Sequence, residues 1–147
     1  ADLAGRKTTG KNGALPLKLL AEGKDLADKL AAAEPAAAQQ LAQAIETAEQ
    51  SIARMVGYAD RPALSAAASN AYLQQMGLTL GAIGLARAYL AAESARTEDA
   101  DGFGSGFYAA QQHNARVYCA YVLPQVYACA AQIENAQALL DVPLELY

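Results

Sequence analysis

The chain has 147 residues, is 54% hydrophobic and carries a formal net charge of −4 at pH 7. Its length suits one domain with a single core, and its acidic balance gives no support to nucleic-acid binding. Alanine is abundant, with runs at 31–33, 36–38 and 66–68, whereas β-branched residues are sparse. Because alanine favours helices and β-branched residues favour strands, the composition predicts an all-α protein.

The sequence shows no signal peptide and no stretch of about 20 apolar residues, so we expect no transmembrane segment. Cys119 and Cys129 would stand roughly 15 Å apart on one helix, which is too far for a disulfide. Reduced thiols suit the cytoplasm, which is the predicted location. Because the first residue is not methionine, we expect a processed or excised chain.

Residues 1–12 are predicted to be a lead-in without helical periodicity, since they are rich in glycine, threonine and lysine. All five lysines of the chain lie in its first 29 residues. A basic segment of this kind could face an acidic partner surface, but a solvated first helix is the simpler explanation.

The first helix is expected over about 14–33, with Pro16 in its first turn. Four leucines form its predicted apolar stripe: Leu15, Leu19, Leu26 and Leu30. Two ion pairs are expected on its solvent side, Lys18 with Glu22 and Asp25 with Lys29.

Glu34-Pro35 breaks the chain, and the second helix is predicted from there to about Tyr58. Its apolar positions recur at alternating spacings of four and three, at Leu41, Ile45, Ala48, Ile52 and Met55. This pattern is typical of antiparallel bundle packing.

The third helix is expected over about 63–94, after a turn at Asp60-Arg61-Pro62. Its predicted stripe comprises Leu73, Met76, Leu80, Ile83 and Leu90. Gly77, Gly81 and Gly84 also lie in this helix, where each glycine costs about 1 kcal/mol relative to alanine. We therefore expect close backbone contact with a neighbour, and a Gly81→Leu variant less stable than Gly13→Leu. The alternative is that the glycines merely loosen the helix.

Thr97–Gly106 is a loop by composition, and the last helix is predicted over about 107–140 with a kink at Pro124. Its stripe comprises Tyr118, Val122, Val126, Cys129 and Ile133. The bundle is expected to occupy 13–141, followed by a tail at 142–147. Since the first two connections are short, the helices are predicted to form an antiparallel up-down four-helix bundle.

No motif predicts a catalytic, cofactor-binding or metal-binding residue. His113 is the only histidine and has no histidine or cysteine at the fourth position after it, so a zinc site is not predicted. Asp99 and Asp101 resemble the start of a calcium loop, but Ala110 stands where the bidentate glutamate is required. The glycine-rich segment 102–106 follows no predicted strand, which excludes a dinucleotide-binding loop.

Arg87 and Arg116 are candidate docking residues because each is the only formal charge in a long stretch, 63–92 and 107–133 respectively. Neither has an acidic residue three or four positions away. Each must therefore reach solvent or an acceptor on another element. We expect Arg116 to tie the last helix to a neighbouring helix or to another part of the protein. The candidate carboxylates are Glu46, Glu49 and Glu134.

Three groups of residues resemble a known family in the same order along the chain. They are Asp2–Lys7, then Ala71–Gly77 with Gly81 and Leu85–Ala88, then Phe107–Ala110 with Ala115, Arg116, Tyr118 and Val122–Pro124. They resemble the end of the catalytic domain, the third helix and the last helix of acyl-CoA dehydrogenases with an extra C-terminal domain. The similarity is closest to the branch that includes 3-methylmercaptopropionyl-CoA dehydrogenase. Gln111 departs from the pattern, since many relatives are expected to have lysine there.

The resemblance implies a parent enzyme that binds FAD and oxidises an acyl-CoA to a 2-enoyl-CoA. No residue here matches the family's catalytic or FAD contacts, so this segment is expected to be a non-catalytic accessory domain. It would pack on the catalytic domain or on a second subunit, as in a homodimer. The candidate packing or docking residues are Gly77, Gly81, Gly84, Arg87, Arg116 and Pro124. Two alternatives stay open: a membrane-docking module, as in some very-long-chain relatives, and a free-standing helical adaptor.

Overall fold

A computed structural model describes residues 3–98 and 104–142 of the chain. The long helices are α1 (Ala14–Leu30), α2 (Pro35–Gly57), α3 (Pro62–Glu98), α4 (Ser105–Val117) and α5 (Gln125–Glu134). The short ones are η1 (Leu3–Thr8), η2 (Thr9–Lys11), η3 (Tyr118–Val122) and η4 (Ala136–Leu139). All regular elements in these ranges are helices, so the predicted all-α class is confirmed. The predicted tail beyond Val142 and the centre of the predicted loop, with Asp99 and Asp101, lie outside the described residues.

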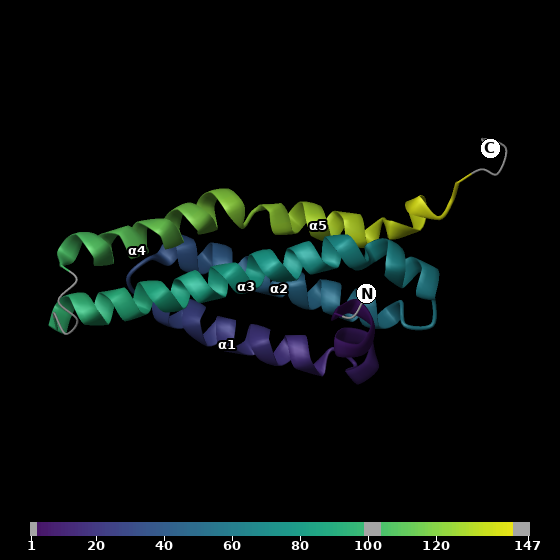
Figure 1. Cartoon of the computed structure of the whole chain (residues 1–147), viewed down its shortest axis with the longest axis horizontal. Helices are drawn as coiled ribbons and strands as arrows, with labels where there is room; N and C mark the ends of the chain where they lie inside the picture. The colour runs from purple at the N-terminus through teal and green to yellow at the C-terminus, as the bar shows by residue number, and fades with distance from the viewer. Residues whose placement is uncertain (1–2, 99–103, 143–147) are drawn as a thin grey trace.

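The helices form four columns that run side by side, and consecutive columns point in opposite directions (Figure 1). The fourth column is α4 continued by η3 and α5. Residues 31–34 and 58–61 connect the first three columns, and connections this short make consecutive helices antiparallel neighbours. Both α4 and α5 lie against α3.

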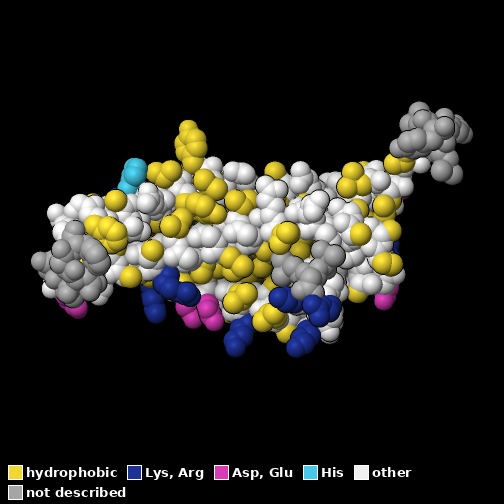
Figure 2. Space-filling model, in the orientation of Figure 1, with side chains coloured by type: hydrophobic (Ala, Val, Ile, Leu, Met, Phe, Trp, Pro, Cys, Tyr) yellow, Lys and Arg dark blue, Asp and Glu magenta, His cyan; other side chains and the backbone are white. Residues whose placement is uncertain are grey.

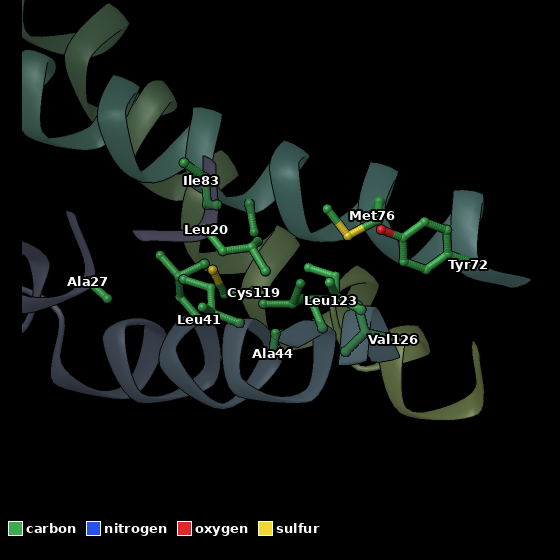
Figure 3. Packing of buried hydrophobic residues seen from close by; sticks show 14 of the residues in the cluster. Leu20, Ala27, Leu41, Ala44, Tyr72, Met76, Ile83, Cys119, Leu123 and Val126 are labelled. Carbon is green, nitrogen blue, oxygen red and sulfur yellow. The ribbon is translucent and has the colours of Figure 1, made fainter. Parts of the chain in front are cut away.

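The core lies between the four columns, and every column contributes side chains to it. Leu20 of α1, Leu41 of α2, Met76 of α3 and Val126 of α5 point toward a common centre (Figure 3). The predicted stripe of α2 is confirmed, because all five of its residues are buried. Complete burial of one such leucine contributes about 1.5–3 kcal/mol, so these contacts provide the main stabilisation of the bundle.

The predicted stripe of α1 is right in its second half and wrong in its first. Leu30 is buried, and Leu26 packs against the core from its edge. Leu15 and Leu19 are 46% and 39% exposed. The buried residues are Pro16, Leu20, Gly23, Ala27 and Leu30. Both sets have helical spacing, but the core side of α1 includes a position with no room for a large side chain. A Cβ at Gly23 would stand 2.5 Å from Ile83 Cδ1.

The stripe predicted for α3 is right in part. Met76 and Ile83 are buried, and Leu80 and Leu90 pack against the core from its edge. Leu73 is wrong, since it is 56% exposed. At this level of α3 the residue that faces the core is Tyr72, and its hydroxyl reaches Thr8 of the N-terminal segment.

The predicted last helix is divided by a π-helical turn that comes just before Pro124. The N–H of Leu123 donates to the carbonyl of Tyr118, five positions back, over 2.9 Å. Pro124 has no N–H to continue the helical ladder, so the wide turn and the proline together separate α4 from α5. The two helices are visibly offset in Figure 1.

The wide turn also shifts the buried positions that precede it. Val126, Cys129 and Ile133 are buried as predicted, but in the five residues before Pro124 the buried ones are Cys119 and Leu123. The predicted Tyr118 and Val122 are only half-buried. A strict helical period extended backwards through Pro124 misses this shift, because a π turn contains more residues than an α turn.

The N-terminal segment 3–11 is helical and packed against the bundle, in contrast to the prediction of a lead-in without helical structure. Ala4 and Thr8 are buried, and the hydroxyls of Thr8 and Tyr72 form a buried hydrogen bond of 2.9 Å. The chain then reverses at Asn12 and Gly13, whose φ angles are 51° and 76°. The proposed domain boundary at residue 13 stays a prediction.

Candidate functional site

The titratable and nucleophilic side chains do not assemble into a catalytic or metal centre in the described part of the chain. Over residues 3–98 and 104–142, no three His, Cys, Asp or Glu side chains are grouped closely enough to hold a metal ion. Burial raises the pKa of the Cys119 thiol to about 11 and also raises that of Cys129. Both thiols are therefore protonated near neutral pH and are poor nucleophiles. The candidate sites are surfaces.

Arg116 lies at the centre of a cluster that joins three elements. Its Nε donates a 2.5 Å hydrogen bond to Oε1 of Glu34, the residue before α2, and its Nη2 pairs with the same oxygen. The Tyr89 hydroxyl of α3 donates to this oxygen over 3.2 Å, and the guanidinium lies 5.8 Å from the centre of the Tyr89 ring. We call Arg116, Glu34 and Tyr89 the Arg116 cluster.

Arg116 has its acceptor on another element, as expected, but this acceptor is none of the three candidate carboxylates. Glu134 pairs instead with Arg54 at 3.2 Å, and Glu49 pairs with Lys24 at 2.7 Å. Glu34 precedes Pro35, and the Glu34-Pro35 pair indicates a helix break rather than a partner for a distant arginine. It is 82 positions from Arg116, and no local pattern links residues that far apart.

The Arg116 cluster favours the ionised form of Glu34. The hydrogen bond from Arg116 lowers the pKa of the Glu34 carboxyl, although burial opposes this effect. Burial, together with the neighbouring Glu34, raises the pKa of the Tyr89 hydroxyl. A carboxylate that accepts hydrogen bonds from two side chains on other elements is a structural tie between helices.

Arg87 lies on the outer side of α3, at its edge with α1. Its Nη2 is 3.7 Å from Oε2 of Glu22, and more than half of each side chain is exposed. An exposed pair at this distance contributes little to stability. Neither ion pair predicted within α1 is formed among the described residues. Glu22 pairs with Arg87 instead of Lys18, and Asp25 and Lys29 are not within ion-pair distance of each other.

The three glycines of α3 differ in their surroundings. A Cβ at Gly81 would stand 2.6 Å from the Tyr118 hydroxyl, which donates to the Leu78 carbonyl over 3.1 Å. At Gly77 and Gly84 a Cβ would meet no described atom within 4 Å. The sequence predicts close contact between these glycines and a neighbouring backbone. Within the described residues, close contact is found at Gly81, and the neighbour is the Tyr118 side chain rather than a backbone.

Two hollows lie between α3 and the fourth column, one near each end, and we call this face of α3 with its two hollows the α3 groove. One stripe of α3 faces it, with spacings of seven, four, three, four and seven: Asn70, Gly77, Gly81, Gly84, Ala88 and Ala95. A hollow of about 240 Å³ at one end is lined by Ala88, Ala91, Ala92, Ala95, Phe107, Tyr108 and Gln111. A hollow of about 380 Å³ at the other end is lined by Ala67, Asn70, Ala71, Gln132, Asn135, Ala138 and Leu139. All of these lining residues are uncharged.

A second surface lies at the start of α1, where leucines and lysines alternate. Leu15 and Leu19 lie one turn apart on α1 and are each more than a third exposed, and Lys18 is exposed between them in the sequence. We call these three residues the α1 patch. It was not predicted as a surface, because Leu15 and Leu19 were assigned to the core.

Charge is distributed unevenly over the molecule. In the face shown in Figure 2, the Lys, Arg, Asp and Glu side chains gather along the α1 edge and at the ends of the bundle. The middle of this face, over α3 and the fourth column, is almost free of them (Figure 2). This agrees with the sequence, in which 63–92 and 107–133 contain one formal charge each. The uncharged side of the bundle therefore coincides with the α3 groove.

Comparison with known proteins gives one match. A family model described as "Acetyl-CoA dehydrogenase C-terminal like" matches residues 19–143. No curated protein and no solved structure matches the chain. The matched residues include most of α1 and all of α2, α3, α4 and α5, so the similarity covers all four columns of the bundle.

Proposed function

The chain belongs to the acyl-CoA dehydrogenase C-terminal-like family, and from this membership we propose that it is the accessory helical domain of an FAD-dependent acyl-CoA dehydrogenase. The observation that carries the proposal is the family match over residues 19–143. The proposed parent oxidises an acyl-CoA to a 2-enoyl-CoA, with FAD supplying the hydride acceptor. This assigns the chain a structural role beside the chemistry.

The described residues do not fit FAD themselves. A dinucleotide is usually held by a glycine-rich turn between a strand and the N-terminus of a helix. The regular elements described here are all helices, so the turn that would hold the pyrophosphate is missing from this part of the molecule. We therefore expect the isolated chain to bind neither FAD nor acyl-CoA tightly.

We propose that the α1 patch docks on the catalytic domain of the parent. Residues Asp2–Lys7 resemble the end of that domain, and segment 3–11 packs against the bundle through Ala4 and Thr8. The α1 patch follows this segment closely along the chain, which supports docking at that point. Exposed leucines beside a lysine suit an apolar partner surface with acidic residues at its rim.

We further propose that the parent is cytoplasmic and belongs to the branch of 3-methylmercaptopropionyl-CoA dehydrogenase, whose acyl group carries a thioether. The support for this branch is the order of the three resembling segments, which include Ala71–Gly77 and Phe107–Ala110. A panel of acyl-CoA substrates tested on the parent enzyme decides it. Faster turnover of the thioether substrate than of unbranched acyl-CoA of equal length is expected.

The docking proposal is tested in the FAD-loaded parent enzyme. A Leu15→Asp/Leu19→Asp variant should lower the parent's melting temperature and release FAD at a lower temperature, because docking of the domain is lost. The matched control is Leu139→Asp, which changes another exposed leucine outside the α1 patch. Equal flavin release in all three proteins would contradict the docking role, and a flavin absorbance band in the purified isolated chain would contradict the accessory role.

A membrane-docking role is the second candidate, and the α1 patch is again the observation that favours it, because leucines beside a lysine can bind an anionic lipid surface. Of the described helices, none has both the length and the hydropathy needed to cross a bilayer. Co-sedimentation with phosphatidylserine vesicles separates the two roles. Binding that is lost in Leu15→Asp/Leu19→Asp would favour the membrane, whereas a chain that stays in the supernatant favours the catalytic domain.

A further inference from the structure

Asn12 and Gly13 form the reversal between segment 3–11 and α1, and they are the only asparagine–glycine pair in the chain. Such a pair is prone to deamidation, because glycine has no Cβ to hinder attack by its backbone nitrogen on the preceding side-chain amide. Asn12 is exposed, and its φ of 51° and ψ of 35° place it in the left-handed region. The surroundings of this pair therefore decide whether it reacts.

The fold holds the pair in a conformation that cannot react. Gly13 is buried, and its N–H, which must lose its proton before attack, donates to the Thr8 carbonyl over 2.7 Å. At the ψ angle of Asn12, the Gly13 nitrogen lies across the Cα–C bond from the Asn12 side chain. Ring closure therefore requires that the hydrogen bond to Thr8 opens and that ψ rotates first.

Thr8 connects this protection to the packing of the N-terminal segment. Its carbonyl accepts the Gly13 N–H, and its hydroxyl forms the buried 2.9 Å hydrogen bond with Tyr72 of α3. On the other side of the pair, the Gly13 carbonyl accepts the N–H of Leu17 in the first turn of α1. Undocking of segment 3–11 is thus sufficient to free the pair, and α1 can stay folded.

We propose that Asn12 is a deamidation site that opens when segment 3–11 leaves the bundle. The Gly13 nitrogen forms a bond to Cγ of Asn12 while the Cγ–Nδ2 bond breaks, and Nδ2 leaves as ammonia with the proton from Gly13. Solvent water then opens the resulting succinimide at either carbonyl, which gives an aspartyl or an isoaspartyl residue. The reaction consumes no oxidant or reductant, and the site does not depend on the proposed function.

The isoaspartyl product does not fit the reversal that protects the amide. It adds a carbon to the main chain between the Thr8 carbonyl and the Gly13 N–H, and it replaces a neutral amide with a carboxylate. The hydrogen bond between these two groups spans the reversal, so its geometry depends on the length of this stretch. Formation of isoaspartate therefore prevents segment 3–11 from docking again.

The test follows residue 12 by peptide mapping and mass spectrometry while the purified 147-residue chain is kept at mildly alkaline pH. Conversion in guanidinium chloride should be at least about 10-fold faster than in the native chain, because unfolding removes the protection. Thr8→Val should raise the native rate about tenfold, which corresponds to about 1.4 kcal/mol in the undocking equilibrium. Thr8→Val/Tyr72→Phe should lose most of this acceleration, because no hydroxyl is then left unpaired.

The matched control is Gly81→Ala, which disturbs the bundle at Tyr118 rather than at segment 3–11. It should leave the native rate unchanged, and all variants should convert equally fast in guanidinium chloride. An unfolded chain that does not convert would overturn the site itself. A native chain that converts as fast as the unfolded one, or equal acceleration by Gly81→Ala and Thr8→Val, would overturn its control by segment 3–11.

The effect of the product is measured on the isoaspartyl chain after its separation by chromatography. It should melt at a lower temperature than the unconverted chain, because segment 3–11 no longer packs on the bundle. The matched control is Asn12→Asp, which introduces the same carboxylate without the extra main-chain carbon and should melt higher than the isoaspartyl chain. Equal melting of the isoaspartyl and unconverted chains would overturn the loss of docking.

Discussion

Arg116 on α4 and Glu34 before α2 are joined by a 2.5 Å hydrogen bond although 82 positions separate them. Tyr89 of α3 donates to the same carboxylate oxygen over 3.2 Å. One carboxylate thus connects the turn between the first two columns with the third and the fourth. Arg116, predicted as a docking residue, has its partner inside the chain.

Glu34→Gln should reduce the free energy of unfolding by about 1 kcal/mol, because the charge-assisted bond to Arg116 is lost while the pair is only partly exposed. Urea denaturation at neutral pH measures this change. In a double-mutant cycle, the Glu34→Gln/Arg116→Gln variant should lose less stability than the sum of the losses of the two single variants. The difference, which is the coupling energy, should be about 0.5 kcal/mol. Strict additivity would show that the two side chains do not interact in solution.

The same pair predicts a dependence on pH. The hydrogen bond from Arg116 lowers the pKa of Glu34 in the folded state below its ordinary value of 4.5. The stability that this pair contributes is therefore complete above the unfolded pKa and is lost as the pH falls through the folded one. The difference in stability between wild type and Glu34→Gln should be constant at neutral pH and shrink below pH 4.5. A difference that grows on acidification would contradict this assignment.

The glycines of α3 predict opposite effects of one substitution. Gly84→Ala should raise the free energy of unfolding of the chain by up to about 1 kcal/mol, because its surroundings are open. Gly81→Ala should lower it by about 1 kcal/mol, since the new Cβ would displace the Tyr118 hydroxyl from its bond to the Leu78 carbonyl. Thermal unfolding at low protein concentration compares the two. Equal gains would mean that the Tyr118 contact has no energetic role.

Gly13→Leu, which the sequence predicts to be the less destabilising of the two leucine substitutions, is unsuitable for this comparison. Gly13 has a φ of 76°, and a Cβ there would stand 2.5 Å from Ile52 Cγ2. A leucine would therefore meet both backbone strain and a steric clash. Gly84 is the better reference, because it lies on the same helix as Gly81 and differs from it mainly in its lack of a close neighbour.

The Thr8–Tyr72 hydrogen bond tests whether the N-terminal segment is part of the folded unit. Thr8→Val keeps the shape of the side chain but leaves the Tyr72 hydroxyl unpaired in the core, which should cost about 1–3 kcal/mol. Adding Tyr72→Phe should restore much of the loss, because both polar groups are then removed. Urea denaturation of the single and double variants measures both effects. A Thr8→Val variant as stable as wild type would show that segment 3–11 is not packed on the bundle in solution.

The two cysteines should be unreactive in the folded chain. Cys119 and Cys129 are both free and buried, and burial raises the pKa of the Cys119 thiol to about 11. Labelling with a disulfide reagent near pH 8 should therefore be slow, and it should release two thiols per chain after unfolding in guanidinium chloride. Rapid labelling of the native chain would indicate that the fourth column opens readily around η3.

Local chemistry along the chain explains what could be predicted without the structure. The abundance of alanine determines the helical class, and Pro35 and Pro62 determine where α2 and α3 begin, because a proline suits the first turn of a helix. The stripe of α2 was also predictable, since its large apolar residues occupy one side only. Three pieces of sequence, in order, were sufficient to indicate the family that the match over 19–143 shows.

Only the tertiary structure decides how the helices face one another. On α1 two adjacent stripes have the same period. Which of them faces the core depends on Ile83 of α3, which leaves no room for a side chain at position 23, where α1 has a glycine. The partner of Arg116 depends on three columns meeting at Glu34, a position that no spacing within one helix encodes. Sequence periodicity describes a single helix, whereas the size of each pocket and the pairing of each charge are properties of several helices packed together.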